Sequence, residues 1–318
     1  MIAGFPLAEI VVGAVALLLL LLMTAPFEAL WWWSQQEEPV QRRPPREVGP
    51  APTEGTTWIV YLAGVGTASS ESSRPEQPLL DRLRDRLGDE AVLVTGVFPY
   101  SVLDHGLTTD RDLSWLWRVL DRMQRRKWPV LPLLINLYNV FQVLVSADRR
   151  YGPFFSLAMA RTIWGRLRAA GYQPGSGDPV VLLGWSGGGQ ICLGASWYLA
   201  DQGAPVYVLS LGGVLSSDPG LDRVRHLWHL YGSRDRVHRL GGLLFPSRWP
   251  TSRDSSWNRA RREGRITTTE IGPYTHSGSP SYLTRRPQPD GSVPIEVTTE
   301  ALLGTLAGAG LLVRDRAR

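Results

Sequence analysis

Residues 179–189, with the sequence PVVLLGWSGGG, constrain the fold of this chain more than any other stretch. The apolar run at 180–183 does not alternate with polar residues, which is typical of a short strand covered on both faces of a sheet. Three glycines follow Ser186, and residues 190–200 are compatible with a helix. The stretch therefore predicts a strand, a sharp turn and a helix in immediate succession.

The turn carries the pattern G-x-S-x-G, with Gly184 and Gly188 on either side of Ser186. A serine displayed on a strained strand-to-helix turn leaves no room for side chains two positions away, which explains both glycines. The turn also directs the main-chain N–H of Gly187 toward the place where an oxyanion would form. We interpret the pattern as a nucleophile elbow; the alternative is a glycine-rich turn that only joins a strand to a helix.

The composition favours a globular protein with a sizeable core, since 43% of the residues are hydrophobic and 20% are charged. The formal net charge is +5, but arginines are interspersed with acids, as at residues 81–86, which indicates a solvated surface. No zinc-finger spacing or stacking-aromatic module supports a nucleic-acid partner. Cys192 is the one cysteine, which excludes an internal disulfide framework and favours a buried packing role for the thiol.

Residues 1–33 are a candidate membrane anchor. The apolar segment 5–27 has the length of roughly 17–25 residues that a membrane helix needs, and the tryptophans at 31–33 would form an aromatic belt. The alternative is a cleaved signal peptide, which would leave the rest of the chain secreted. Because no Lys or Arg precedes the apolar run and no clear cleavage site follows it, we favour an uncleaved transmembrane helix.

The segment after the anchor sets the expected topology. It contains three arginines, Arg42, Arg43 and Arg46, whereas nothing basic precedes the apolar run. The positive-inside rule therefore predicts that the main domain lies on the cytoplasmic side. Residues 34–56 are polar and proline-rich, which indicates a semi-rigid linker.

Strand-like and helix-like segments alternate through the remaining domain, residues 57–318. We expect strands at 57–62, 91–97, 180–183, 205–211, 225–231 and 265–271, and helices at 77–87, 113–126, 153–170, 190–200 and 297–313. This alternation predicts a doubly wound, mostly parallel α/β sheet, with a helical insertion around residues 112–170. Residues 241–265 show no clear periodicity.

Residues 128–145 form a second strongly apolar stretch, bracketed by basic residues. We interpret it as a buried helix inserted between core elements. The alternative is a lid or interfacial helix that covers an acyl-binding pocket.

Asp235 and His276 are the residues that we expect to activate Ser186. A serine hydroxyl needs a base to take its proton, and the base needs an orienting carboxylate. All three residues follow predicted strands, and the carboxyl ends of strands are where an open α/β sheet places its active site. The chain order Ser, Asp, His is one of the known triad orders.

Other residues compete for these two roles. Asp235 could be only a turn former, and Asp218 and Asp222 are rival acids on the preceding loop. The remaining histidines are His105, His226, His229 and His238. His226 and His229 belong to a predicted strand region and suit structural roles, His238 is too close to the acid in sequence, and His105 precedes the elbow.

With these residues the chain resembles the α/β-hydrolase superfamily, in its serine esterase and lipase-like members. The resemblance implies that Ser186 is the nucleophile, His276 the general base and then the general acid, and Asp235 the orienting carboxylate. It also implies that Gly187 and a residue of the loop after the first strand, Val65 or Gly66, form the oxyanion hole. Ala63-Gly64-Val65-Gly66 stands there in place of the His-Gly-Gly-Gly motif of lipases.

The sequence thus predicts a membrane-tethered serine hydrolase that cleaves a carboxylic ester or thioester, for which a lipid-like substrate would suit the apolar segments. The reaction would pass through an acyl-enzyme on Ser186 and needs no cofactor or metal. A non-catalytic α/β-hydrolase-like module that binds a ligand or partner at the membrane is the alternative. An acyltransferase would use the same acyl-enzyme.

Overall fold

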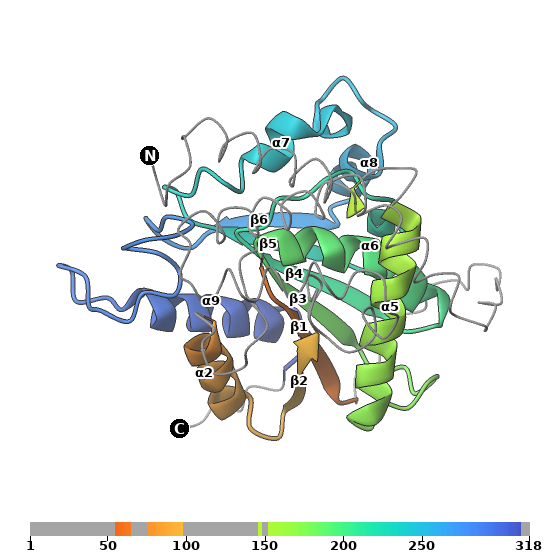
Figure 1. The fold of residues 1–318 in the computed structure, drawn as a ribbon, viewed down its shortest axis with the longest axis horizontal. Helices are drawn as coiled ribbons and strands as arrows, with labels where there is room; N and C mark the ends of the chain where they lie inside the picture. The colour runs from red at the N-terminus through yellow and green to blue at the C-terminus, as the bar shows by residue number, and fades with distance from the viewer. Residues whose placement is uncertain (1–54, 65–75, 98–145, 148–151, 313–318) are drawn as a thin grey trace, which may run out of the picture.

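The computed structural model describes residues 55–64, 76–97, 146–147 and 152–312 (Figure 1). Several predicted features lie outside the described residues: the membrane anchor, nearly all of the linker, the helix at 113–126, the apolar stretch at 128–145 and His105. No helix in the described ranges is long and apolar enough to cross a membrane.

The described strands form one parallel sheet. In chain order they are β1 (Thr57–Leu62), β2 (Ala91–Val97), β3 (Val180–Trp185), β4 (Val206–Leu211), β5 (Leu227–Tyr231) and β6 (Ile266–Glu270). Their order across the sheet is β2-β1-β3-β4-β5-β6, and every neighbouring pair is parallel. The predicted α/β class with a mostly parallel sheet is therefore confirmed. The strand order reverses between β1 and β3, and a crevice outside the carboxyl ends of strands forms at such a point.

Helices cover both faces of the sheet (Figure 1). On one face α2 (Gln77–Leu87) and α9 (Pro294–Gly308) pack into one apolar core. On the other face α5 (Gly152–Ala169) and α6 (Gly187–Asp201) pack into a second core. The sheet is thus doubly wound, as the alternation of segments predicts.

The central strand β3 shows why its sequence does not alternate. Val180 and Leu182 belong to the core under α5 and α6, whereas Val181 and Leu183 belong to the core under α2 and α9. Each of the four is at most 2% exposed, so both faces of the strand require apolar side chains. The one cysteine, Cys192, is fully buried in the first of these cores, as expected.

The structure departs from the expected elements after β5. The segment without periodicity contains α7 (Leu240–Leu244), the 3₁₀-helix η3 (Pro246–Arg248) and α8 (Ser256–Arg262). These helices are too short to show a repeat of 3.6 residues. The last helix was expected at 297–313, but α9 begins at Pro294, which suits the first turn of a helix, and ends before Gly310, whose φ of 70° stops it.

We predict that Leu182→Ala lowers the free energy of unfolding by about 2–5 kcal/mol, because it removes a fully buried side chain from the central strand and leaves a cavity. Leu243→Ala is the matched control, since Leu243 is 69% exposed and its truncation should change stability by less than about 0.5 kcal/mol. Urea unfolding of the two variants measures both values, and equal effects would contradict the burial described here.

Candidate active site

Ser186 stands at the junction between β3 and α6 with an unusual backbone conformation. Its φ is 53° and its ψ is −123°, and among the residues that the structure describes it is the only non-glycine with positive φ. Such a conformation costs roughly 1–3 kcal/mol and is found where function or packing imposes it. The main chain holds it from both sides, since the Ser186 N–H donates to the Leu211 carbonyl and the Ser186 carbonyl accepts from Gly189.

Close main-chain packing explains the two glycines of the motif. A Cβ on Gly184 would lie 2.6 Å from Cα of Gly189, and a Cβ on Gly188 would lie 2.5 Å from the Leu62 carbonyl oxygen. Real Cβ atoms do not approach main-chain atoms so closely, and neither neighbour is a flexible side chain that could move. The sharp turn and the start of α6 against the end of β1 are therefore possible only with glycine at both positions.

Asp235 lies in the loop after β5 and uses its two carboxylate oxygens differently. Oδ1 accepts the N–H of Val237 at 2.7 Å, which stabilises the turn. Oδ2 accepts a hydrogen bond from Nδ1 of His276 at 2.9 Å and one from the hydroxyl of Tyr282 at 2.7 Å. Asp235 therefore both stabilises the turn and contacts the histidine, so the two roles considered for it are compatible.

His276 bridges the acid and the serine. Its Nε2 lies 2.8 Å from the Ser186 Oγ, on the opposite side of the ring from the contact with Asp235. An ionised carboxylate only accepts hydrogen bonds, so Nδ1 carries the proton in the neutral ring and Nε2 is left as the acceptor for the serine hydroxyl. The structure therefore brings all three predicted residues into one hydrogen-bonded chain.

Two aromatic residues that are not among the predicted site residues contact this hydrogen-bonded chain. Trp185 stacks on the His276 ring, with centroids 4.9 Å apart and planes 12° from parallel. Tyr282 is fully buried, and its oxygen accepts the N–H of Gly232 at 2.7 Å while it donates to Asp235. The position of Trp185 near the site could be predicted from the sequence, because Trp185 directly precedes Ser186 in the motif. Tyr282 belongs to a loop without periodicity, so no sequence pattern indicates its position.

Electrostatics keep the acid ionised. Burial raises the pKa of the Asp235 carboxyl, but the hydrogen bond and charge of His276 and the bonds from Tyr282 and Val237 outweigh it, so that the pKa lies below its ordinary value. The carboxylate is therefore charged at neutral pH and can stabilise a positive imidazole beside it.

The rival acids are engaged elsewhere. Asp218 accepts hydrogen bonds from Gln190 at 3.1 Å and from the Gly220 N–H at 2.8 Å, and burial raises the pKa of Asp218 to about 6. Asp222 pairs with Arg259 through both carboxylate oxygens. Neither has a hydrogen bond to His276 in the described structure.

The rival histidines in the described ranges have structural partners. His226 lies 2.9 Å from the Thr267 hydroxyl on the neighbouring strand. His229 is buried 3.2 Å from the Ser210 hydroxyl, and burial lowers the pKa of His229 to about 3. His238 faces His229 with its ring and donates its main-chain N–H to Asp235 at 3.3 Å.

The predicted oxyanion hole is described in part. Gly187 is the first residue of α6, where main-chain N–H groups have no acceptor within the helix. Val65 and Gly66 lie outside the described residues. The loop that leads to them starts beside the elbow, because a Cβ on Gly64 would lie 3.0 Å from the Cβ of Ser186.

The site is largely enclosed by protein. Ser186 is 3% exposed, and the side chain of His276 is 16% exposed. The described residues contain no group of three or more His, Cys, Asp or Glu side chains that could hold a metal ion. Ser186, His276 and Asp235 are side chains suited to nucleophilic attack and proton transfer.

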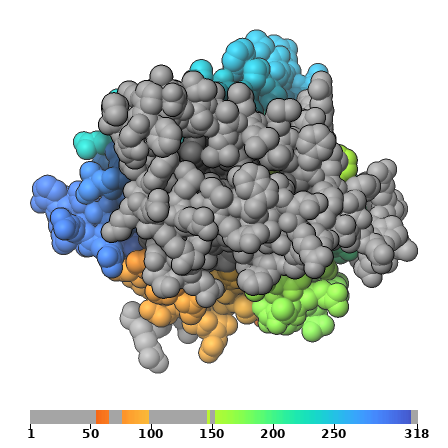
Figure 2. Space-filling model, in the orientation of Figure 1, coloured from red at the N-terminus to blue at the C-terminus, as the bar shows by residue number. Residues whose placement is uncertain are grey.

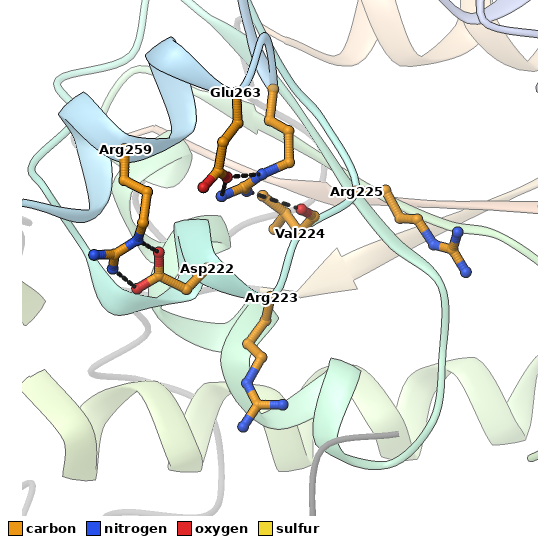
Figure 3. Close-up of a pocket in the computed structure, with 7 residues that line it drawn as sticks. Asp222, Arg223, Val224, Arg225, Arg259 and Glu263 are labelled. Carbon is orange, nitrogen blue, oxygen red and sulfur yellow. Dashed lines mark hydrogen bonds and ion pairs between the residues drawn. The ribbon is translucent and has the colours of Figure 1, made fainter. Parts of the chain in front are cut away.

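A separate surface pocket of about 510 Å³ lies away from this site (Figure 3). Its lining residues precede β5 and β6, at the amino ends of the strands, whereas Ser186 follows the carboxyl end of β3. Figure 3 shows Arg259 turned toward Asp222, and Arg265 pairs with Glu263 in the same way. Both acids of the pocket are thus paired with arginines, and the pocket contains none of Ser186, Asp235 and His276.

Comparisons with known proteins give matches only among solved structures. No family model matches the chain, and no curated protein matches it. The chain is similar to a dienelactone hydrolase-like promiscuous phosphotriesterase from metagenomic libraries, at 15% identity and a TM-score of 0.41 over 81% of this chain and 86% of that one. It is also similar to a hyperthermophilic esterase from the archaeon Pyrobaculum calidifontis, at 13% identity and a TM-score of 0.43. That match covers 92% of this chain and 94% of the esterase chain. The arrangement of the site residues, and not these similarities, supports the functional assignment below.

We predict that Tyr282→Phe lowers the free energy of unfolding by about 2 kcal/mol at pH 7, because a hydrogen bond to a charged carboxylate is lost and the Gly232 N–H loses its acceptor. The depressed pKa of Asp235 contributes stability above about pH 4, and this contribution is lost as the pH falls further. The variant raises that pKa toward its ordinary value. Urea unfolding should therefore show a larger difference from the parent at pH 7 than at pH 3.

Tyr172→Phe is the matched control. Tyr172 is also buried, but its hydroxyl contacts the Asp178 carbonyl at 3.5 Å and the Ser176 side chain, and in the described structure it accepts no bond from a main-chain N–H of the site. Its truncation should change the free energy of unfolding by less than about 1 kcal/mol, with no difference between the two pH values. A Tyr282→Phe effect that is equally independent of pH would contradict a role in stabilising the carboxylate.

Proposed function

We propose that this protein is a serine hydrolase that cleaves a carboxylic ester or thioester. The single observation that supports it best is the hydrogen-bonded chain from the Ser186 Oγ through both nitrogens of His276 to Oδ2 of Asp235. A nucleophile, a base and an orienting carboxylate in contact form the minimal apparatus of acyl transfer.

In the first half of the reaction Ser186 Oγ attacks the substrate carbonyl carbon while Nε2 of His276 takes the hydroxyl proton. The negative charge that develops on the carbonyl oxygen is met by the N–H of Gly187 and by a second donor, which we place at Val65 or Gly66. The imidazolium then gives its proton to the leaving alkoxide or thiolate as the carbon–oxygen or carbon–sulfur bond breaks. An acyl-enzyme on Ser186 results.

In the second half a water molecule attacks the acyl carbon. His276 takes a proton from that water at Nε2 and returns it to Ser186 Oγ as the acyl group leaves as a carboxylic acid. Throughout, Asp235 stays ionised and holds the ring in one tautomer, and the stacked Trp185 restricts rotation of the ring. If an alcohol or amine replaces the water, the same apparatus performs acyl transfer.

The contacts favour an enzyme over a binding module of the same fold. A binding role gives no reason to align Ser186, His276 and Asp235 at 2.8 Å and 2.9 Å, or to hold the serine at a positive φ. A lipid-like acyl group is the substrate that we propose, because two apolar segments of the sequence, residues 5–27 and 128–145, suit a membrane setting.

A fluorophosphonate probe should label the full-length protein at Ser186, and Ser186→Ala should abolish labelling. Asp235→Asn should retain slow labelling, reduced by a factor of about 10⁴, because the ring loses its preferred tautomer. Ser233→Ala is the matched control, since Ser233 lies in the same turn as Asp235 but its hydroxyl contacts only the Gly272 carbonyl, at 3.5 Å. Labelling that survives Ser186→Ala would disprove the mechanism.

p-Nitrophenyl esters of graded chain length, tested on the parent and on Ser186→Ala, would then define the acyl preference. A rate that rises from acetate to longer chains supports the lipid-like substrate. A rate that is highest for acetate contradicts that part of the proposal and leaves the hydrolase intact.

We also propose that residues 1–33 anchor the protein in a membrane with the hydrolase domain on the cytoplasmic side. The apolar length and the three arginines after it support this topology. After alkaline carbonate extraction the protein should stay in the membrane pellet with its N-terminal peptide intact. Leu19→Arg combined with Leu20→Arg should release it, because each charge costs about 3 kcal/mol at the centre of a membrane helix. An N-terminus that begins beyond residue 33 would instead indicate a cleaved signal peptide.

A further inference from the structure

The large hydrophobic side chains that are exposed in the described structure are all in one short segment. They are Leu240 at 39%, Leu243 at 69%, Leu244 at 49% and Trp249 at 46%, which lie on α7 and directly after η3. We call these four residues the α7 ridge. Single exposed hydrophobic residues are common on protein surfaces, but such a cluster marks an interaction site.

The fold holds the α7 ridge in place. The indole N–H of Trp249 donates to the Gly242 carbonyl at 2.9 Å, which ties η3 to α7. The Asn258 side chain donates to the Trp249 carbonyl at 2.8 Å, and Arg248 donates to the Leu215 carbonyl at 2.8 Å. These contacts hold α7, η3 and Trp249 together and against the neighbouring loop, so the exposed leucines belong to a structured part of the surface.

Positive charge predominates around the α7 ridge, although Asp254, directly after Arg253, is also exposed. Residues 236–253 contain four arginines and no acidic residue. Arg236, Arg239 and Arg253 are exposed, whereas Arg248 is half-buried over the ring of Trp257 at 3.6 Å. The surface therefore combines leucines, a tryptophan and exposed cations, which suits a partner with an apolar interior and an anionic surface.

The α7 ridge lies on the same side of the molecule as Ser186, where the carboxyl ends of the strands are. Arg248 and α7 pack on the main chain of Leu215, in the loop after β4. The next residue of that loop, Ser216, donates its N–H to Gln190 near the start of α6. In Figures 1 and 2 the segment that contains α7 lies at the top of the molecule.

We propose that the α7 ridge binds the surface of an anionic lipid bilayer. The leucines and Trp249 enter the boundary between headgroups and acyl chains, and the exposed arginines contact lipid phosphates. A second copy of the chain fits less well, because a symmetric contact would place these arginines against their own counterparts. Bilayer contact through the α7 ridge is a property of the folded domain, and it depends neither on residues 1–33 nor on the hydrolase activity.

A single fluorescent label can report on this contact in the full-length protein. Cys192 is fully buried, and burial raises the pKa of its thiol, so that an introduced surface cysteine is labelled selectively. Leu243→Cys places an environment-sensitive fluorophore on the α7 ridge. Ala169→Cys is the matched control, because Ala169 is exposed at the end of α5, on the opposite edge of the sheet.

With phosphatidylglycerol-containing vesicles the label at position 243 should shift to blue emission and be quenched by lipids that carry a quencher in the acyl chain. The label at position 169 should not change. Co-sedimentation measured in parallel gives the bound fraction, so that tethering by residues 1–33 alone appears as bound protein with no change at position 243. That outcome would overturn the proposal.

Replacement of one exposed cation tests the electrostatic part. Arg236→Gln should raise the vesicle concentration that half-saturates the signal at position 243 by about fivefold, and Arg236→Lys should leave it nearly unchanged. An equal response with purely phosphatidylcholine vesicles would contradict an anionic partner. A shift at position 243 that depends on protein concentration without vesicles would show that a second copy covers the α7 ridge.

Discussion

The close approach of main chain to main chain at the end of β3 is the constraint on which the rest of the site depends. Gly188 lies against the carbonyl oxygen of Leu62, and Gly184 against Gly189, with distances that exclude any Cβ. This contact places the start of α6 directly on the ends of β1 and β3, and it imposes the positive φ of Ser186. The serine is thereby displayed at the point where the strand order reverses, with the N-terminus of α6 beside it.

The second requirement is a carboxylate that remains charged although it is fully buried. Asp235 meets it by distributing its hydrogen bonds, with one oxygen given to the turn and the other to His276 and Tyr282. The buried tyrosine also accepts from Gly232, so that the loops after β5 and β6 are fixed to one another through the acid. Fold stability and the alignment of the imidazole therefore depend on the same few contacts.

Much of this architecture could be predicted from the sequence, because apolar residues follow either an unbroken run, as in β1 and β3, or one helix face, as in α2. The bounds of β1, α2 and β2 agree with the predicted segments 57–62, 77–87 and 91–97, because each has an uninterrupted or strongly periodic apolar pattern. The short helices between β5 and β6 could not be predicted, since their positions are set by contacts such as Asn258 with the Trp249 carbonyl. Ser186, Asp235 and His276 can be predicted as candidates from their places after strands, whereas the position of Tyr282 depends on tertiary contacts alone.

The most direct measurement of the central claim is a crystal structure of the protein after reaction with an alkyl phosphonate that mimics the tetrahedral intermediate. Phosphorus should be bonded to the Ser186 Oγ, a phosphonyl oxygen should accept the Gly187 N–H, and His276 should remain between the adduct and Asp235. Phosphorus on a different residue, or an adduct on Ser186 with the imidazole displaced from the carboxylate, would contradict that claim.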